Sequence, residues 1–328
     1  MAFRKEQFRR ALGNWFRQYG RDLPWRRTRD PYAVLVSELM LQQTQVATVI
    51  PYYLAWLRRF PDFATLSRAS GDEVLHAWQG LGYYARARNL RATAQKVVNE
   101  YGGRFPRSIE QMGQLPGIGK YTARAMATFA FDQPVPIVEA NTARVLSRLF
   151  NRRVAIDSNA GQTTLWNDAA TLVPKLNARM YNSALTDLGA LVCLPRKPKC
   201  DICPVEKFCD AKDPEALPVR RSRLLVRRLR QNHAFVLRRG KMLLEQSSTR
   251  WRGMWILPRL QSKTATARPI YTSAFPFTHH RIELVVYRRP APKQLAPDQR
   301  WFGSIDHIPM PSPHRRAAAY LLDTANIR

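Results

Sequence analysis

The sequence predicts an all-α part followed by a smaller mixed α/β domain. Over residues 1–212, apolar residues recur three and four positions apart and helix-capping residues are frequent, which is typical of short helices. Residues 232–328 instead contain short runs in which apolar and polar residues alternate, which predicts strands. We interpret the basic, proline-containing stretch between them, residues 213–231, as a linker. A chain of 328 residues is long enough for two such domains.

The charge of the chain favours a polyanionic partner. Lys and Arg number 53 against 24 Asp and Glu, a formal net charge of +29. Such an imbalance costs self-repulsion, so we favour a nucleic-acid partner over a neutral metabolite or a merely solubilising surface. The sequence has no run of about 18 apolar residues and no apolar signal-peptide core. We expect an intracellular monomer, in the cytoplasm or nucleoid of a bacterium, that does not bind a membrane.

Apolar spacing and capping chemistry predict the first helices. Five large apolar residues at helical spacing predict that the Arg-rich opening is a core helix rather than a transit peptide: Phe8, Leu12, Trp15, Phe16 and Tyr19. Asp30-Pro31 predicts a later helix start, because Asp accepts backbone N–H bonds and Pro lacks the N–H that would go unused there. Glu38 falls two turns further on, among apolar neighbours. From this pattern alone, Glu38 is either a surface carboxylate or a buried one with a raised pKa.

All four cysteines lie close together in the sequence, as Cys193-x6-Cys200-x2-Cys203-x5-Cys209. Four thiolates this close can converge on one centre, and a [4Fe-4S] cluster takes four cysteine ligands. Structural zinc usually uses two close cysteine pairs separated by a longer span, which this spacing fits poorly. Disulfides fit less well still in an intracellular protein. The sequence therefore predicts a [4Fe-4S] cluster.

A glycine-containing turn joins two helical stretches at Leu115-Pro116-Gly117-Ile118-Gly119-Lys120. Gly117 and Gly119 allow a tight turn in which backbone N–H groups approach an anion closely. Such a turn would position the protein on a phosphate backbone without reading sequence. An ordinary interhelical turn is the alternative.

Two further segments carry a family resemblance. Ser37–Val46 (SELMLQQTQV) and Gly80–Arg86 (GLGYYAR), together with the turn and the cysteine spacing, resemble the MutY-type adenine DNA glycosylases of the endonuclease III superfamily. The resemblance implies that residues 1–212 form a helix-hairpin-helix glycosylase domain with a structural iron-sulfur loop at 193–209. It also implies a monofunctional base excision repair enzyme that flips adenine out of double-stranded DNA at an 8-oxoguanine:A or G:A mismatch and hydrolyses its N-glycosidic bond.

The resemblance assigns two catalytic carboxylates. Glu38 takes the role of the general acid that protonates N7 of the flipped adenine and then assists the attacking water. Because the transition state resembles an oxocarbenium ion, a second carboxylate must offset or trap positive charge at the sugar. That position is Glu139, in a Val-Glu-Ala-Asn segment where the family usually has Leu-Asp-Gly-Asn. Glutamate preserves the charge but adds one methylene, so we expect the loop around it to have shifted.

Further DNA-contacting roles are carried over residue by residue. Trp25 and Arg26 resemble residues of the adenine pocket, and Ser183 stands where the family commonly has Gln or Glu on the adenine edge. The wedge that enters the base stack is Gln43, with Leu41 as a second candidate; Thr44 beside it is also expected to contact DNA, and Tyr83 is expected to stack near the opposing base. Gly117, Gly119 and Lys120 are expected to contact the backbone. Tyr121 stands where bifunctional relatives carry a Schiff-base lysine, and Lys120 should point elsewhere because one helical residue turns the side chain by roughly 100°.

The C-terminal domain is expected to read the lesion. HAFVLRRGKMLLEQ predicts two strands around an Arg-Gly-Lys turn, and RIELVVYRR alternates as a strand does. WRGMWILP resembles a strand region of the Nudix-like C-terminal domain of MutY, but the acidic helix of active Nudix hydrolases is missing. Phe277-Thr278-His279 is similar to the family's Phe-Ser-His loop, so Thr278 and His279 are candidate 8-oxoguanine readers.

Two other functions remain open at this stage. A thymine or uracil mismatch glycosylase of the same superfamily also suits Tyr121 and the altered Glu139 segment. A catalytically weak damage-binding protein would suit the replaced carboxylate and Ser183.

Overall fold

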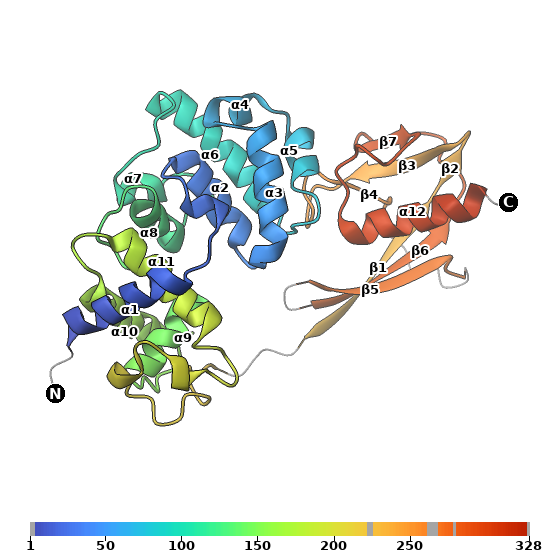
Figure 1. Ribbon diagram of the computed structural model, residues 1–328. Helices are drawn as coiled ribbons and strands as arrows, with labels where there is room; N and C mark the ends of the chain where they lie inside the picture. The colour runs from blue at the N-terminus through green and yellow to red at the C-terminus, as the bar shows by residue number, and fades with distance from the viewer. Residues whose placement is uncertain (1–3, 222–225, 261–267, 278–279, 327–328) are drawn as a thin grey trace. The chain divides into compact units, whose positions relative to one another are not determined.

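The computed structural model describes residues 4–221, 226–260, 268–277 and 280–326 of the chain (Figure 1). It divides into two compact units. The first comprises Met1–Leu57 and Lys96–Ser222, and the second comprises Arg58–Gln95 and Arg223–Arg328. The candidate lesion readers Thr278 and His279 lie outside the described residues.

The first unit is built from helices, as the sequence predicts. The elements that belong to it wholly or in part are α1 (Lys5–Tyr19), η1 (Pro24–Arg26), α2 (Pro31–Leu41), α3 (Val46–Arg59), α6 (Ala85–Tyr101), α7 (Ile109–Gly113), α8 (Lys120–Phe129), α9 (Ala140–Leu149), α10 (Asn159–Leu172), α11 (Ala178–Leu191), η2 (Cys200–Ile202) and η3 (Glu206–Phe208). Helices α3 and α6 cross the division between the two units. No helix in the described residues is long and apolar enough to cross a lipid bilayer.

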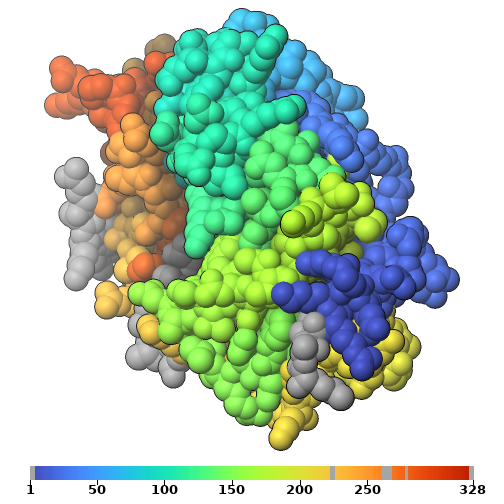
Figure 2. Space-filling model, turned by 90° about the vertical axis from the view of Figure 1, so that its left-hand side faces the viewer, coloured from blue at the N-terminus to red at the C-terminus, as the bar shows by residue number. Residues whose placement is uncertain are grey.

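Helices α1, α9, α10 and α11 share a hydrophobic core. Its fully buried or nearly buried side chains include Phe8, Leu12, Leu146, Leu149, Leu165, Leu172, Leu185 and Leu188. Figure 2 shows α1, in blue, lying against the yellow-green α10–α11 region. The predicted core helix at the N-terminus is therefore confirmed, except that Tyr19 in its last turn is 57% exposed.

The start of α2 follows the capping chemistry of its sequence. Asp30 is the N-cap, and its carboxylate accepts hydrogen bonds from the N–H groups of Tyr32 and Ala33 at 3.1 and 3.2 Å. Pro31 is the first helical residue. All residues from Tyr32 to Met40 are buried, so this helix runs through the interior and carries Glu38 with it.

The second unit joins two sheets to helices from both of its segments. Its elements, apart from the part of α6 that it contains, are α4 (Phe63–Arg68), α5 (Gly71–Ala77), β1 (Arg227–Phe235), β2 (Leu237–Arg238), β3 (Lys241–Gln246), β4 (Trp255–Ile256), β5 (Tyr271–Phe277), β6 (His280–Arg288), β7 (Gln299–Phe302) and α12 (Ser312–Asn326). One sheet has the strand order β1-β6-β5, with β1 parallel and β5 antiparallel to β6. In the other sheet β3 pairs with β2, β4 and β7, all antiparallel.

Both predicted strand patterns of the C-terminal region are confirmed. Strands β2 and β3 form a hairpin, and its turn residues Arg239 and Gly240 both have positive φ, as a type I′ turn requires. In β6, Ile282, Leu284 and Val286 are fully buried as the alternation predicts, but Val285 is fully buried as well and Tyr287 is buried, so the alternation does not continue through the second half of the strand.

The compact units divide the chain differently from the boundaries expected from sequence. Residues 58–95, expected in the N-terminal domain, group with the C-terminal residues: the Met310 N–H donates to Gln79 Oε1 at 3.0 Å, and Arg88 donates to the carbonyl of Arg252 at 2.8 Å. The expected linker is partly structured as well. The carbonyl of Val219 accepts a hydrogen bond from Ile156, and β1 already begins at Arg227.

Candidate active site

A cavity of about 640 Å³ in the first unit gathers most of the site residues expected from sequence. Of these, its walls include Trp25, Arg26, Glu38, Leu41, Gln43, Thr44, Gly117, Gly119, Tyr121, Glu139 and Ser183. They come from η1, α2, the α7–α8 turn, α8, the start of α9 and α11. A cavity of this size lies within the range of about 300–1,000 Å³ that is typical of small-molecule binding sites.

Glu38 lies in the wall of this cavity with 8% of its surface exposed. Burial raises the pKa of Glu38 to about 7, because water no longer solvates the charged form. The hydrogen bond from Tyr121 Oη to Glu38 Oε2, at 3.3 Å, lowers the pKa of Glu38 and so partly offsets burial. The charge of Glu139 raises the pKa further and that of Arg26 lowers it. Glu38 can therefore hold or release a proton near neutral pH, as a general acid must.

Glu139 is the N-cap of α9. Its carboxylate accepts hydrogen bonds from the N–H groups of Asn141 at 2.8 Å and Thr142 at 3.0 Å, while Thr142 Oγ1 accepts one from the Glu139 N–H. Burial raises the pKa of Glu139, and the two backbone bonds partly offset that effect. Both carboxylate oxygens are thus held at the positive end of a helix, and the segment needs no positive φ at Ala140.

An ion-pair network behind the cavity was not anticipated from sequence. Asp187 on α11 is fully buried and accepts hydrogen bonds from the side chains of Arg21 and Arg26, both of which line the cavity. Burial alone would raise the pKa of Asp187, but the bonds from Arg26 and Arg21 outweigh it and lower the pKa. The network fixes Arg26 close enough to influence Glu38 electrostatically.

Helix α11 presents two hydroxyl groups to the cavity, one turn apart. Ser183 is 5% exposed, and Thr186 has a buried Oγ1 without a hydrogen-bond partner among the described residues. Sequence reasoning identified Ser183 but missed Thr186. The spacing of three residues along a predicted helix was the signal that could have found it.

A short non-helical segment separates α2 from α3. Helix α2 ends at Leu41 and α3 begins at Val46, and between them Gln43 is exposed with a φ of 55°. A positive φ is uncommon for a residue other than glycine and turns the chain sharply. Leu41, Gln43 and Thr44 all line the same cavity.

The α7–α8 connection is a tight turn that contains two glycines, as the sequence predicts. Gly117 has a φ of 75°, and Gly119 is the N-cap of α8, with open space where a Cβ would stand. The next two side chains point in different directions. Tyr121 faces the cavity, whereas the Lys120 ammonium lies 4.7 Å from the centre of the Trp166 ring. This divergence agrees with the orientation predicted from the helical turn.

Tyr83 belongs to the second unit. Its side chain is 46% exposed, its φ is 49°, and the guanidinium of Arg86 lies 5.3 Å from its ring centre. An exposed ring on a sharply turned backbone is available for stacking.

The four cysteines form one loop after α11, with free thiols on Cys193, Cys200, Cys203 and Cys209. The pKa of Cys203 is raised to about 11, first by burial and also by the other three thiols, so all four lie close enough to interact. Among the described residues, no three His, Cys, Asp or Glu side chains are grouped around a single metal-ion position. The donor set of four mutually interacting thiols fits a [4Fe-4S] cluster.

Two buried arginines connect this loop to α9. Arg148, 1% exposed, donates to Cys193 Sγ at 3.2 Å and to the Leu194 carbonyl at 2.6 Å. Arg144 donates to the carbonyls of Cys193 and Gly189 and to Asn141 Oδ1. Their positive charges would offset the negative charge of a thiolate-ligated cluster. The same contacts tie the loop to the helix that Glu139 caps.

Comparison with known families agrees with this arrangement. Residues 36–166 match the HhH-GPD superfamily of base excision DNA repair proteins, and residues 193–209 match the iron-sulfur binding domain of endonuclease III. These two matches include Glu38, Tyr121, Glu139 and all four cysteines, whereas η1 and α11 lie outside the matched ranges. They define the class of protein: a helix-hairpin-helix glycosylase fold with an iron-sulfur loop.

Several relatives share one name. The adenine DNA glycosylase of Rattus norvegicus is 46% identical over 215 residues, which cover 62% of this chain and 41% of the relative. That of Mycolicibacterium smegmatis is 43% identical, over 59% of this chain and 66% of the relative. That of Buchnera aphidicola subsp. Schizaphis graminum is 31% identical, over 79% of this chain and 76% of the relative. The chain belongs to the adenine DNA glycosylase family, although it spans only about two fifths of the mammalian relatives' length.

Solved structures show the same fold. A thermostable thymine-DNA glycosylase is 35% identical, with a TM-score of 0.58 over 63% of this chain and 95% of that one. A non-covalent endonuclease III–DNA complex, at 22% identity, has a TM-score of 0.53 over the same share of this chain. Both likenesses cover less than two thirds of the chain.

Proposed function

We propose that this protein hydrolyses the N-glycosidic bond of adenine mispaired in double-stranded DNA. The observation that carries the proposal is a single cavity lined by two carboxylates, Glu38 and Glu139, with Tyr121 hydrogen-bonded to the first. Glycosidic cleavage needs a proton donor for the leaving group and a negative charge for the sugar cation. The name shared by the relatives supports adenine as the base.

Glu38 acts as the general acid. A purine leaves poorly as an anion, so protonation at N7 must accompany or precede cleavage. Because burial raises the pKa of Glu38 to about 7, a useful fraction is protonated at neutral pH. The Tyr121 hydroxyl then stabilises the carboxylate formed when the proton has moved. The same carboxylate can accept a proton from the attacking water.

Glu139 stabilises the positive charge that develops at the sugar. Its two backbone hydrogen bonds hold the carboxylate in one orientation, so no reorganisation is needed as the charge develops. The bonds also favour the ionised form against the effect of burial. Arg26, anchored on Asp187, together with Ser183 and Trp25, is positioned to contact the flipped base.

The substrate is proposed to be adenine opposite 8-oxoguanine, or opposite guanine, on the basis of the resemblance in the C-terminal region. That region is a mixed α/β structure, and we propose a Nudix-like, non-hydrolytic role for it. We also propose that Gln43 enters the base stack, that Tyr83 stacks near the opposing base, and that Gly117 and Gly119 contact phosphate. The [4Fe-4S] cluster would be bound by the four cysteines and would supply structural support to the loop.

The proposal is tested by base release from matched duplexes. Duplexes of one sequence with 8-oxoguanine:A, G:A, G:T, G:U or C:G at the central pair are incubated with excess protein. We expect free adenine from the first two duplexes and no base from the others. Release of thymine or uracil alone would replace the proposal with the second candidate below, and tight mismatch binding without any release would make the chain a damage-binding protein.

A thymine-DNA glycosylase activity is the second candidate. The similar solved structure of a thermostable thymine-DNA glycosylase, at 35% identity, favours it. Tyr121 at the catalytic position suits that branch as well. The same duplex series distinguishes the two, because only the released base differs.

We predict that the protein is monofunctional. Tyr121 cannot form an imine with the sugar, and the Lys120 ammonium lies over the Trp166 ring. Strands should therefore break only after alkali or heat treatment of the product. The measurement is gel analysis with and without alkali, alongside borohydride trapping, with Lys120→Gln as control. A borohydride-trapped adduct that disappears in Lys120→Gln would contradict the prediction.

We also predict that His279 contributes to lesion preference. Residues Phe277-Thr278-His279 resemble the family's Phe-Ser-His lesion-reading loop, with Thr in place of Ser. His279→Ala should lower the ratio of excision rates for 8-oxoguanine:A over G:A several-fold, while the G:A rate changes little. Exposed His307→Ala serves as the matched control. Equal ratios in wild type and His279→Ala would remove this residue from the recognition of 8-oxoguanine.

A further inference from the structure

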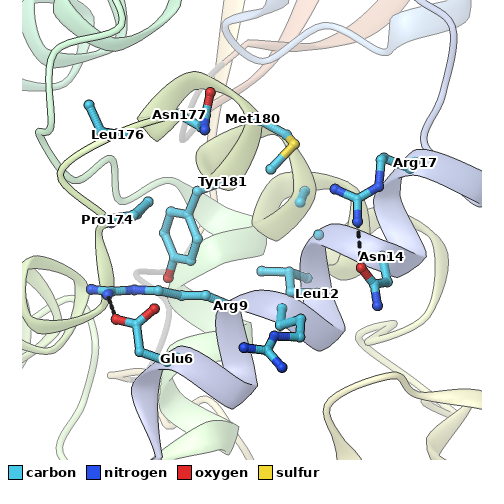
Figure 3. Close-up of a pocket in the computed structure, with 13 residues that line it drawn as sticks. Glu6, Arg9, Leu12, Asn14, Arg17, Pro174, Leu176, Asn177, Met180 and Tyr181 are labelled. Carbon is cyan, nitrogen blue, oxygen red and sulfur yellow. Dashed lines mark hydrogen bonds and ion pairs between the residues drawn. The ribbon is translucent and has the colours of Figure 1, made fainter.

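A second cavity, of about 250 Å³, lies in the first unit between α1 and the start of α11 (Figure 3). It lies on a different side of α11 from the candidate active site. Met180, Tyr181 and Ala184 face the second cavity, whereas Ser183 and Thr186 face the first. With about 3.6 residues per turn, these two sets point in directions well over 90° apart. The second cavity is therefore a separate feature.

The buried hydroxyl of Tyr181 is the feature that indicates a ligand-binding site. The residue is 4% exposed, and its Oη is buried without a hydrogen-bond partner among the described residues. In Figure 3 the ring reaches from α11 into the cavity and ends near the stem of Arg9. Burial raises the pKa of Tyr181, so the hydroxyl stays protonated and remains a donor. A buried donor without an acceptor destabilises the free protein. A ligand that accepts this hydrogen bond would therefore stabilise the fold.

The walls of this cavity carry excess positive charge. Arg9, Arg10 and Arg17 line it, and Glu6 is the acidic residue among the lining side chains. Arg9 is paired with Glu6 and also donates to the carbonyls of Leu172 and Val173, so it is held in place. The side chains of Arg10 and Arg17 have no ion pair to any described residue; Arg17 donates only to Asn14 Oδ1.

Apolar side chains complete much of the wall of this cavity. The N-terminus of α11, at Ala178, adds no free binding group, because the carboxylate of Asp132 already accepts a hydrogen bond from the Arg179 N–H at 2.8 Å. Leu12, Pro174 and Met180 supply apolar surface. A volume of about 250 Å³ corresponds to roughly eight water molecules, which exceeds a single small ion.

We propose that this cavity binds a small organic oxyanion, a phosphate monoester or carboxylate on a compact apolar body. The anionic group accepts the hydrogen bond of Tyr181 and faces Arg10 and Arg17. The apolar body packs on Pro174 and Met180. This inference is independent of the glycosylase proposal, because none of these residues lines the first cavity.

The test is calorimetric titration of the full-length protein with phenyl phosphate and with benzoate, at physiological ionic strength. Inorganic phosphate and phenol serve as the two half-ligands. We expect one of the two organic anions to bind at least about tenfold more tightly than either half-ligand, and the tighter one identifies the anionic group. Arg17→Gln should weaken that binding several-fold.

Tyr181→Phe is the decisive variant because it removes only the oxygen. We expect about tenfold weaker binding of the tighter anion, a factor within the range for a hydrogen bond to a charged group, and an unchanged or higher melting temperature. Tyr19→Phe, at an exposed tyrosine of α1, is the matched control and should bind like wild type.

Three outcomes would overturn the proposal. An unchanged affinity in Tyr181→Phe would mean that the anion binds elsewhere on the basic surface. Absence of binding by both organic anions at millimolar concentration would mean that the cavity takes neither. A lower melting temperature of Tyr181→Phe would mean that the hydroxyl already has a partner inside the fold. None of these measurements depends on base excision, so their failure is distinguishable from failure of the glycosylase proposal.

Discussion

Glu38→Gln should bind an 8-oxoguanine:A duplex as wild type does and lose adenine release by about 10² to 10⁴-fold in single-turnover assays. The substitution removes the proton donor but keeps the size of the side chain and an acceptor for the Tyr121 hydroxyl. Binding should persist because it depends on charge and on backbone contacts that Glu38 does not make. Normal single-turnover excision by this variant would contradict the role of Glu38.

Glu38→Gln should be more stable than wild type in alkaline solution. The pKa of Glu38 in the folded protein is about 7, above the ordinary glutamate value of 4.5, so the stability linked to its proton is fully present below pH 4.5. It is lost as the pH rises through about 7, when folding must bury a charge. At pH 8, the free energy of unfolding of Glu38→Gln should therefore exceed that of wild type by about 3 kcal/mol. Exposed Glu100→Gln is the control, and its stability should not change with pH in this way.

Glu139→Gln should slow adenine release at least a hundredfold, because a neutral amide cannot offset the charge of the sugar cation. Glu139→Asp should also slow it, by about a hundredfold, because the carboxylate withdraws by roughly 1 Å from a position set by two backbone hydrogen bonds. In both predictions, the loop around Glu139 has adapted to the longer side chain, and the N-cap position is the working position of the carboxylate. Single-turnover kinetics on one 8-oxoguanine:A duplex measures both variants.

Loss of the helix cap must be separated from loss of the charge. Thr142→Val removes the reciprocal bond to the Glu139 N–H but leaves the carboxylate in place. It should lower stability by about 1 kcal/mol and leave excision close to wild type. Full activity in Glu139→Gln would exclude a charge role for this residue. A faster reaction in Glu139→Asp would show that the longer side chain is an uncompensated departure.

Sequence reasoning succeeded where the determining chemistry is local. The Asp30-Pro31 helix start and the Arg239-Gly240 turn each depend on a few adjacent residues. The burial of Glu38 does not depend on adjacent residues alone, because its hydrogen-bond partner Tyr121 lies 83 residues further along the chain. The pattern around Glu38 was compatible with both exposure and burial until tertiary contacts were known.

Contacts between distant segments account for what the sequence did not predict. Asp187 holds Arg21 and Arg26 from 166 and 161 residues away, and no local pattern marks such a network. The grouping of residues 58–95 with the C-terminal region depends on contacts such as that of Gln79 with Met310, 231 residues apart. Tyr181 could be assigned to a helix from its sequence, but its unpartnered hydroxyl is a property of the packed structure.

The pH dependence of single-turnover adenine release tests most directly the claim that a buried, protonated Glu38 drives the reaction. Excess protein is mixed with an 8-oxoguanine:A duplex from pH 5 to pH 10, and free adenine is measured over time. Because Glu38 must carry a proton and Glu139 must not, we predict a bell-shaped profile whose alkaline limb falls about tenfold per pH unit above about pH 7. A rate that stays level between pH 7 and pH 9 would contradict the account.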